Sequence, residues 1–360
     1  MPESRQFNLT FERQIFWQSR LRLSYIGTRA VNLLQYTFDN LPISPVYDPS
    51  SPFKVAADWM CAGTGQTING VKIATTATCP NAVPIANNEI SIRVPRTNDR
   101  RPNPNGSTNL VVNNGSKAWY NAAQLEWETG LYRGFQGRMT YTFSKDIDEG
   151  SEATFVGTGD INIFPPNERY KKGLSRMDNR HRFTLVGTYA FPWFQNRHDV
   201  VRAVLGGWQI SAVGRLASGS PFTIVDSGAV DVDFDGVGNA RPVVVDPAYS
   251  GGWHVSYPGG SQQKVPKSAF RHPQYGDTYA DFIGRNTYYT DGVKNVDFGL
   301  YKTFEIARGY AVMFRLDAFN VFNQVTWWYP DNNFNSPTFM KLTATNYTPR
   351  TLQAGVRFLY

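Results

Sequence analysis

The chain lacks a long apolar run and has few charged residues. No stretch approaches the roughly 18 apolar residues that a membrane-spanning helix needs, and the mean hydropathy is -0.39, so a helical membrane protein is excluded. Charged residues make up 18% of the 360 residues, below the usual share of about a quarter. The net charge of +7 comes from scattered Lys and Arg rather than from one basic stripe, which argues against a nucleic-acid partner.

Cysteine is nearly absent, and no secretory leader is visible. Cys61 and Cys79 lie in one Gly-, Thr-, Asn- and Pro-rich stretch without a neighbouring His or third Cys, which argues against a metal site. The pair predicts a loop disulfide and an oxidising compartment, with two unrelated free thiols as the alternative. Met1 is followed by polar residues and no apolar h-region. If the protein is exported, we expect that Met1 is not its natural N-terminus.

Aromatic residues and turn formers are plentiful, with 14% aromatics, 31 Gly and 22 Pro. Nine stretches of about ten residues alternate apolar and polar side chains, a period of two that predicts β-strands with one face of each kind. In the last stretch Leu352, Ala354 and Val356 share one face, and Gln353 and Arg357 fall on the other. The nine strands are expected near residues 5–14, 21–25, 124–129, 138–143, 182–189, 208–216, 295–300, 312–317 and 351–360.

The connections between these strands are alternately short and long. The long loops are expected at about 28–117, 145–179, 218–293 and 323–349, and a helical turn at 200–205 within one short connection. Bacterial outer-membrane barrels have short periplasmic turns and long extracellular loops, and strands of about ten residues span their apolar band of about 25 Å. The sequence therefore predicts an all-β, antiparallel transmembrane β-barrel in the outer membrane of a Gram-negative bacterium. A soluble β-sandwich is the alternative, but loops of this length are rare in compact domains.

An odd number of strands does not close such a barrel. Bacterial single-chain barrels have an even number, and an open sheet leaves unpaired backbone groups in hydrocarbon at both edges. We therefore expect an incomplete barrel, the C-terminal part of a larger one. The terminal strand, which ends on Tyr360, is expected to be bound by the barrel-assembly machinery. Aromatic residues near the short turns are expected to form a membrane-interface girdle: Phe16, Trp17, Tyr132, Trp193, Trp208, Tyr310 and Tyr360.

Several short segments are spread along the chain, and their order and spacing are informative. They are Tyr120-Asn121-Ala122, Tyr141-Thr142-Phe143-Ser144-Lys145, Asp178-Asn179-Arg180-His181-Arg182-Phe183, Gly206-Gly207-Trp208-Gln209, Ser218-Gly219-Ser220-Pro221-Phe222, Asn295-Val296-Asp297-Phe298-Gly299 and Phe319-Asn320-Val321-Phe322-Asn323. In this order and spacing they resemble the C-terminal barrel of TonB-dependent outer-membrane receptors, particularly the Oar-like group with an N-terminal carboxypeptidase-regulatory-like domain.

The resemblance implies a transport function. It implies a barrel of about 22 strands with a plugged lumen, which takes up a scarce nutrient such as a saccharide, siderophore or peptide with energy passed on by TonB. It also implies a plug domain, a TonB-contacting box and about 13 further strands that these residues do not include. A passive porin or adhesion-type barrel without energy coupling is the alternative.

The long loops contain two candidate binding sites. Trp327, Trp328 and Tyr329 form an aromatic cluster beyond the eighth strand that suits stacking on sugars or aromatic siderophores, with an outer aromatic girdle as the alternative. A second group, in the 231–236 loop, has the spacing at which a calcium loop begins: Asp231, Asp233 and Asp235. The twelfth position is Pro242 rather than Glu, so a structural Ca²⁺ there is weighed against an acidic solvated turn.

The remaining polar residues suggest a lumen and no enzyme. Inward charges are expected to line a wet wall and to face the plug: Glu126, Glu128, Arg138, Arg315 and Asp317. Basic residues of the first long loop suit lipopolysaccharide phosphates, with a solvated basic loop as the alternative: Arg96, Arg100 and Arg101. The four histidines are far apart and show no Ser/Asp spacing of a catalytic triad, so neither an enzymatic activity nor a cofactor is predicted.

Overall fold

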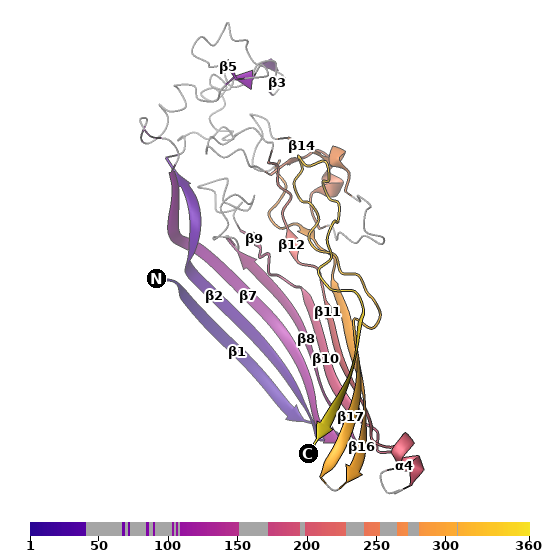
Figure 1. The fold of residues 1–360 in the computed structure, drawn as a ribbon. Coiled ribbons are helices and arrows are strands. Elements are labelled where there is room, and N and C mark those ends of the chain that lie inside the picture. Colours follow the sequence, from indigo (N-terminus) through magenta and orange to yellow (C-terminus); the bar gives the residue numbers. More distant parts are fainter. Residues whose placement is uncertain are drawn as a thin grey trace.

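One curved antiparallel sheet dominates the fold (Figure 1). The computed structural model describes residues 1–40, 67–68, 71–72, 84–85, 89–90, 103, 106, 109–150, 172–194, 199–227, 241–252, 265–272, 281–307 and 309–360. The long strands are β1 (Glu3–Gln14), β2 (Ser19–Asp39), β7 (Asn109–Tyr132), β8 (Phe135–Asp148), β10 (His181–Ala190), β11 (Trp208–Ala217), β16 (Val293–Ala307), β17 (Tyr310–Phe319) and β18 (Thr351–Leu359). Each of the nine strands predicted from the alternation is confirmed.

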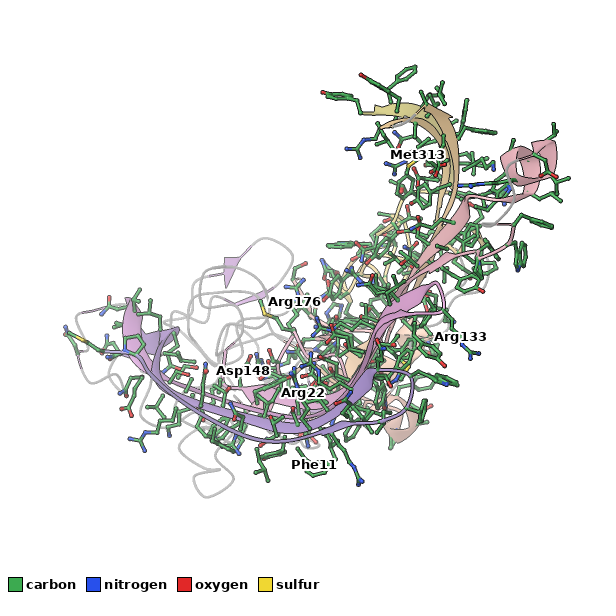
Figure 2. All side chains as sticks on the ribbon, turned by 90° about the horizontal axis from the view of Figure 1, so that it is seen from below. Phe11, Arg22, Arg133, Asp148, Arg176 and Met313 are labelled. Atoms are coloured by element: carbon green, nitrogen blue, oxygen red, sulfur yellow. The ribbon has the colours of Figure 1, made fainter. Side chains whose placement is uncertain are left out.

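The strands lie side by side in chain order, and the sheet they form is open. The order is β1-β2-β7-β8-β10-β11-β16-β17-β18, with the short β9 (Gly173–Leu174) paired to β8. Within the described residues β1 and β18 are the two edges, so this sheet does not close on itself. Figure 2 shows it bent into an arc with one concave and one convex face.

The two faces of the sheet differ in polarity from one edge to the other. On the convex face Phe11 lies opposite Leu23, and on the concave face Glu12 lies opposite Arg22. Figure 2 shows Phe11 and Arg22 on opposite sides of the ribbon. Because side chains alternate along a strand, a shift of one residue in any pairing would bring polar side chains onto the apolar face. The same division holds at the other edge, where Phe314 lies opposite Val356 and Arg315 opposite Gly355.

The convex face is apolar and uncovered. Leu9 is 75% exposed, Phe11 65% and Phe358 72%. The other sheets of the described residues have two strands each, and none covers this face. The soluble β-sandwich is therefore wrong, because a sandwich buries its apolar face against a second sheet.

The first long loop is shorter than expected because its flanking strands are longer. β2 continues to Asp39 and β7 begins at Asn109, whereas the loop was expected at about 28–117. The alternation of β2 is interrupted by register shifts near Leu33, and Asn32 has a left-handed φ of 57°. A bulge of this kind hides the second half of a strand from a period-two pattern. The other long loops begin and end within four residues of the expected positions.

The short turns use the chemistry that tight hairpins require. Between β7 and β8, Arg133 and Gly134 have φ values of 50° and 86°, the positive pair that matches the twist of a two-residue hairpin. A Cβ at Gly134 would lie 2.2 Å from the backbone oxygen of Ala190, so this position needs glycine. Trp17 and Tyr132 stack at 6.3 Å between ring centroids beside these turns.

The connection between β10 and β11 contains the predicted helical turn. Helix α4 spans Val200–Leu205, and the carboxylate of Asp199 caps it by accepting the backbone N–H of Arg202 at 3.2 Å. Within the described part of the chain, no helix has the length and apolar character to pass through a membrane.

Candidate functional site

The long loops after β11 and β17 share an apolar core at the end of the sheet opposite the short turns. We call it the loop core; its members are Phe222, Ile224, Val265, Ala269, Phe270, Ile283, Tyr288, Phe334, Phe339, Met340 and Leu342. None of them is more than 6% exposed. Phe270 packs edge to face on Phe334 and Phe339 at 6.3 and 6.1 Å between ring centroids, a geometry that adds about 0.5–1.5 kcal/mol per pair to the burial itself.

Short regular elements organise the backbone around the loop core. β12 (Pro221–Phe222) pairs with β15 (Tyr288–Tyr289), and β13 (Val243–Val244) pairs with β14 (Phe270–Arg271). Two 3-10 turns, η2 (Pro247–Tyr249) and η3 (Lys267–Ala269), complete it. The described parts of these loops are therefore folded, and they form backbone hydrogen bonds of their own.

Buried polar contacts attach the loop core to the sheet. The Arg285 side chain, 3% exposed, donates to the backbone oxygen of Asp148 at 2.9 Å and to its carboxylate at 2.6 Å. Asp148 is the last residue of β8. Asn286 donates its side-chain amide to the Leu174 carbonyl in β9 at 2.7 Å. These contacts position the loops relative to the strand ends.

The three aromatic residues predicted as a binding site lie together on the loop core. Trp327 and Tyr329 are partly buried against it, whereas Trp328 is 49% exposed. Trp328 and Tyr329 meet edge to face at 5.6 Å between ring centroids. The guanidinium of Arg176 lies 4.8 Å from the centre of the Tyr329 ring. Trp327 and Tyr329 thus pack on the loop core, whereas the rings of an outer aromatic girdle would face lipid.

A small cavity of about 70 Å³ lies beside these rings. It is lined by Asn179, Ser218, Ser220, Thr290, Asp291, Val293, Trp327, Trp328, Tyr329 and Asn346. One water has a share of about 30 Å³ in the liquid, so the cavity admits one small group of a ligand rather than a whole molecule.

The polar wall of the cavity contains donors, acceptors and one carboxylate. The Asn179 amide donates to the Ser220 hydroxyl at 2.9 Å, and its oxygen accepts from Arg182 at 3.1 Å. The Asp291 carboxylate accepts the backbone N–H of Gly292 at 3.0 Å. Burial raises the pKa of Asp291, opposed by that hydrogen bond and by the charge of Lys294. Hydroxyl, amide and carboxylate groups facing aromatic rings suit a ligand that has both hydroxyls or amines and an apolar surface.

The cavity lies on the concave side of the sheet. Val293 has the parity of the inward residues of β16, such as Asn295, which pairs with Arg215. Arg215 in turn donates to the hydroxyl of Tyr347, at 3.4 Å, beside the cavity-lining Asn346. The loop after β17 therefore extends over the concave face.

Charged side chains form a network on the same face, nearer the short turns. Glu126, 6% exposed, accepts from Arg138 at 2.7 Å and Arg22 at 3.4 Å. Arg20 bridges Glu128 at 2.7 Å and Glu12 at 3.2 Å. The strand register and these contacts put Glu126, Glu128 and Arg138 on the concave face with Arg22, and the expectation that they line a lumen stays a prediction. Arg315 and Asp317 also face inward and pair with each other at 2.6 Å.

Three predicted site features lie outside the described residues. The expected disulfide of Cys61 and Cys79 is one, and the expected calcium loop with Asp231, Asp233 and Asp235 is another. The third is the group of basic residues expected at lipopolysaccharide, Arg96, Arg100 and Arg101. Across the ranges that the structure describes, no group of three or more His, Cys, Asp or Glu side chains is arranged to hold a metal.

Comparison with known proteins identifies the family. Residues 1–353 match the family described as outer membrane beta barrel domain. No curated protein matches the chain. Similar solved structures include the outer membrane transporter YddB from Escherichia coli, with 11% identity and a TM-score of 0.46. The similarity covers 99% of this chain and 32% of that chain.

Two further solved structures are similar at the same level. The pyoverdine outer membrane receptor FpvA from Pseudomonas aeruginosa has 10% identity and a TM-score of 0.39, with 100% of this chain and 30% of that chain covered. The ferric-catecholate import receptor Fiu from E. coli has 9% identity and a TM-score of 0.41, with 99% and 27% covered. The chain thus spans less than a third of the length of these structures. Because the family match covers nearly the whole chain, the protein belongs to the outer membrane beta barrel domain family and is located in the outer membrane of a Gram-negative bacterium.

Proposed function

We propose that the chain is part of a TonB-dependent receptor that takes up a scarce nutrient. Its long strands form part of the barrel wall, and its folded loops lie on the extracellular side. The observation that carries this proposal is the ordered loop core, with its aromatic and polar cavity on the concave side of the wall. A passive pore needs loops that leave the lumen open, whereas a receptor needs loops that hold a binding surface in a fixed geometry. The role is one of transport, not of catalysis.

The open edges of the sheet support the larger barrel in this proposal. β1 is exposed along its whole length, and its outer edge and that of β18 lack a neighbouring strand among the described residues. In hydrocarbon each unpaired backbone group costs several kcal/mol. Further strands on both edges remove this cost, and a plug in the resulting lumen would face the charges around Glu126. Membership of the Oar-like group stays a prediction.

The ligand class is proposed from the chemistry of the cavity. A carboxylate, an amide and hydroxyls opposite indole and phenol rings suit a saccharide, or a siderophore or peptide with hydroxyl or amine groups. The volume of about 70 Å³ holds one such group, and the exposed Trp328 offers a stacking surface at its rim.

Energy coupling separates the receptor from the passive alternative. We expect the protein, expressed from its own gene and reconstituted in a planar bilayer, to show no steady ion conductance, because a plug fills its lumen. In the host, deletion of TonB is expected to abolish uptake of the ligand. A large constant conductance, with uptake that survives loss of TonB, would instead establish the porin alternative.

Trp328 gives the cleanest test of the aromatic site, since it is not needed to fill the loop core. Trp328→Ala is expected to weaken ligand binding about tenfold, the equivalent of one ring contact of about 1.4 kcal/mol. Binding is measured by calorimetry with a series of saccharides and siderophores. Phe322→Ala is the matched control, because Phe322 is 66% exposed and does not line the cavity. Equal affinities for wild type and Trp328→Ala across all bound ligands would remove this residue from the site.

Two expected partners stay predictions. Lipopolysaccharide is proposed to contact the basic residues of the first extracellular loop, which lie outside the described residues. The barrel-assembly machinery is proposed to bind β18, whose outer edge has no partner strand among the described residues.

A further inference from the structure

The periplasmic turn between β10 and β11 exposes apolar side chains. On α4, Val200, Ala203 and Val204 follow the spacing of one helix face, and all three are exposed. Val200 is 78% exposed and Val204 56%. A helix face of this composition is stable in an apolar or interfacial environment rather than in water.

The helix lies on the lipid side of the wall. Figure 2 shows α4 outside the arc, on the convex face, and Figure 1 shows it at the short-turn end of the strands. The indole N–H of Trp208 donates to the backbone oxygen of Val204 at 3.0 Å. Trp208 pairs with Lys302, and Lys302 with Phe314, so these residues share the convex face. The contact of Trp208 therefore joins the last turn of α4 to the convex face of the sheet.

A groove between α4 and the end of β16 adds charged groups to this apolar surface. It has a volume of about 500 Å³ and is lined by Trp193, Asp199, Arg202, Ala203, Gly206, Gly207, Thr303, Phe304 and Glu305. Arg202 pairs with Glu305 at 3.0 Å. The lining therefore contains a guanidinium, that of Arg202, which can bind a phosphate. It also contains the carboxylates of Asp199 and Glu305, which can bind an ammonium group. One lipid headgroup is long enough to contact both kinds of group.

Lys302 shows that the surface is adapted to the boundary between lipid and water. It is on the convex face, and its ammonium group lies 4.7 Å from the ring centre of Phe304 and 5.6 Å from that of Trp208. The ammonium group donates to the Gly206 carbonyl beside the groove. A lysine on a lipid-facing strand bends in this way toward the polar interface.

We propose that α4 and this groove form a phospholipid site in the periplasmic leaflet. The face with Val200 and Val204 inserts among the acyl chains. The groove holds a zwitterionic headgroup of the phosphatidylethanolamine type, with the phosphate at Arg202 and the ammonium at Asp199 and Glu305. The site is distinct from the cavity beside Trp328, which lies on the opposite face and at the opposite end of the sheet.

Site-directed labelling tests the insertion of α4. A fluorescent probe at Val204→Cys, in a Cys61→Ser/Cys79→Ser background, is attached to the protein expressed from its own gene and reconstituted in phosphatidylethanolamine-containing vesicles. We expect quenching by brominated acyl chains and protection from iodide. Phe358→Cys on the lipid face should behave alike, and Gln353→Cys on the concave face should not be quenched by brominated lipid. A probe at Val204 that iodide quenches, or that neither quencher reaches because another protein covers it, would overturn the proposal.

Lipid retention tests the headgroup site. After detergent extraction, wild-type protein is expected to retain phosphatidylethanolamine, measured by native mass spectrometry, and Arg202→Gln is expected to retain about tenfold less. Arg202→Lys, which keeps the charge, should retain more than Arg202→Gln. Equal retention by wild type and Arg202→Gln would overturn the headgroup site.

Discussion

Asp148→Ala is expected to release the loop core from the wall while the strands remain folded. The substitution leaves the Arg285 guanidinium, whose side chain is 3% exposed, without the carboxylate at the end of β8. Breaking one side of a buried ion pair costs about 3–5 kcal/mol, comparable to the stability of a small folded unit. The measurement is amide hydrogen exchange of the described loop segments, where protection should fall sharply relative to that of the strand interiors.

The double variant Asp148→Ala/Arg285→Met separates the ion pair from simple loss of packing. Removing both charged groups leaves no buried guanidinium without its carboxylate, so the double variant should recover most of the protection that Asp148→Ala loses. Arg5→Ala is the surface control, because Arg5 and Glu3 form an exposed pair of the kind that contributes little. If Asp148→Ala leaves loop protection unchanged, the buried pair does not hold the loops to the sheet.

The strands were predictable because the signal for each one is local. Side-chain alternation depends only on neighbours in sequence, and so does the helical turn at 200–205. The loop core was not predictable. Phe222, Tyr288 and Phe334 come from distant segments without any period, and only the finished sheet brings them together. The far half of β2 was hidden by the bulge at Asn32, where a left-handed residue breaks the alternation.

One part of the candidate site could be predicted from the sequence, and the other part could not. Trp327, Trp328 and Tyr329 are consecutive, so their clustering is visible in the sequence. The polar wall is assembled from separate strand ends: Asn179 precedes β10, Ser218 follows β11, and Asp291 precedes β16. The only sequence signal for it was that Asn179, Ser218 and Ser220 fall in segments of the receptor resemblance, which assigns them no binding role.

A charge on the convex face in the middle of a strand should destabilise the protein strongly. The same charge on the next residue, whose side chain lies on the concave face, should not. Ala212 lies near the centre of β11 and pairs with Phe298 on the apolar face, whereas Val213 faces inward, opposite Asp297. At the bilayer midplane an outward arginine costs about 2–4 kcal/mol. Ala212→Arg is therefore expected to lower the free energy of unfolding by that amount, measured by urea titration of the protein in phospholipid vesicles.

Val213→Arg is a matched control because it differs only in the direction of the side chain. Its guanidinium can reach Asp297 or lumen water, so the expected change is below about 1 kcal/mol. Comparing the changes in the free energy of unfolding of the two variants shows which face contacts lipid. This comparison does not depend on any ligand, plug or partner. Equal losses would indicate that both faces are buried in protein. A larger loss for Val213→Arg would place lipid on the concave face, so the charge network around Glu126 and the cavity beside Trp328 could not lie in a lumen.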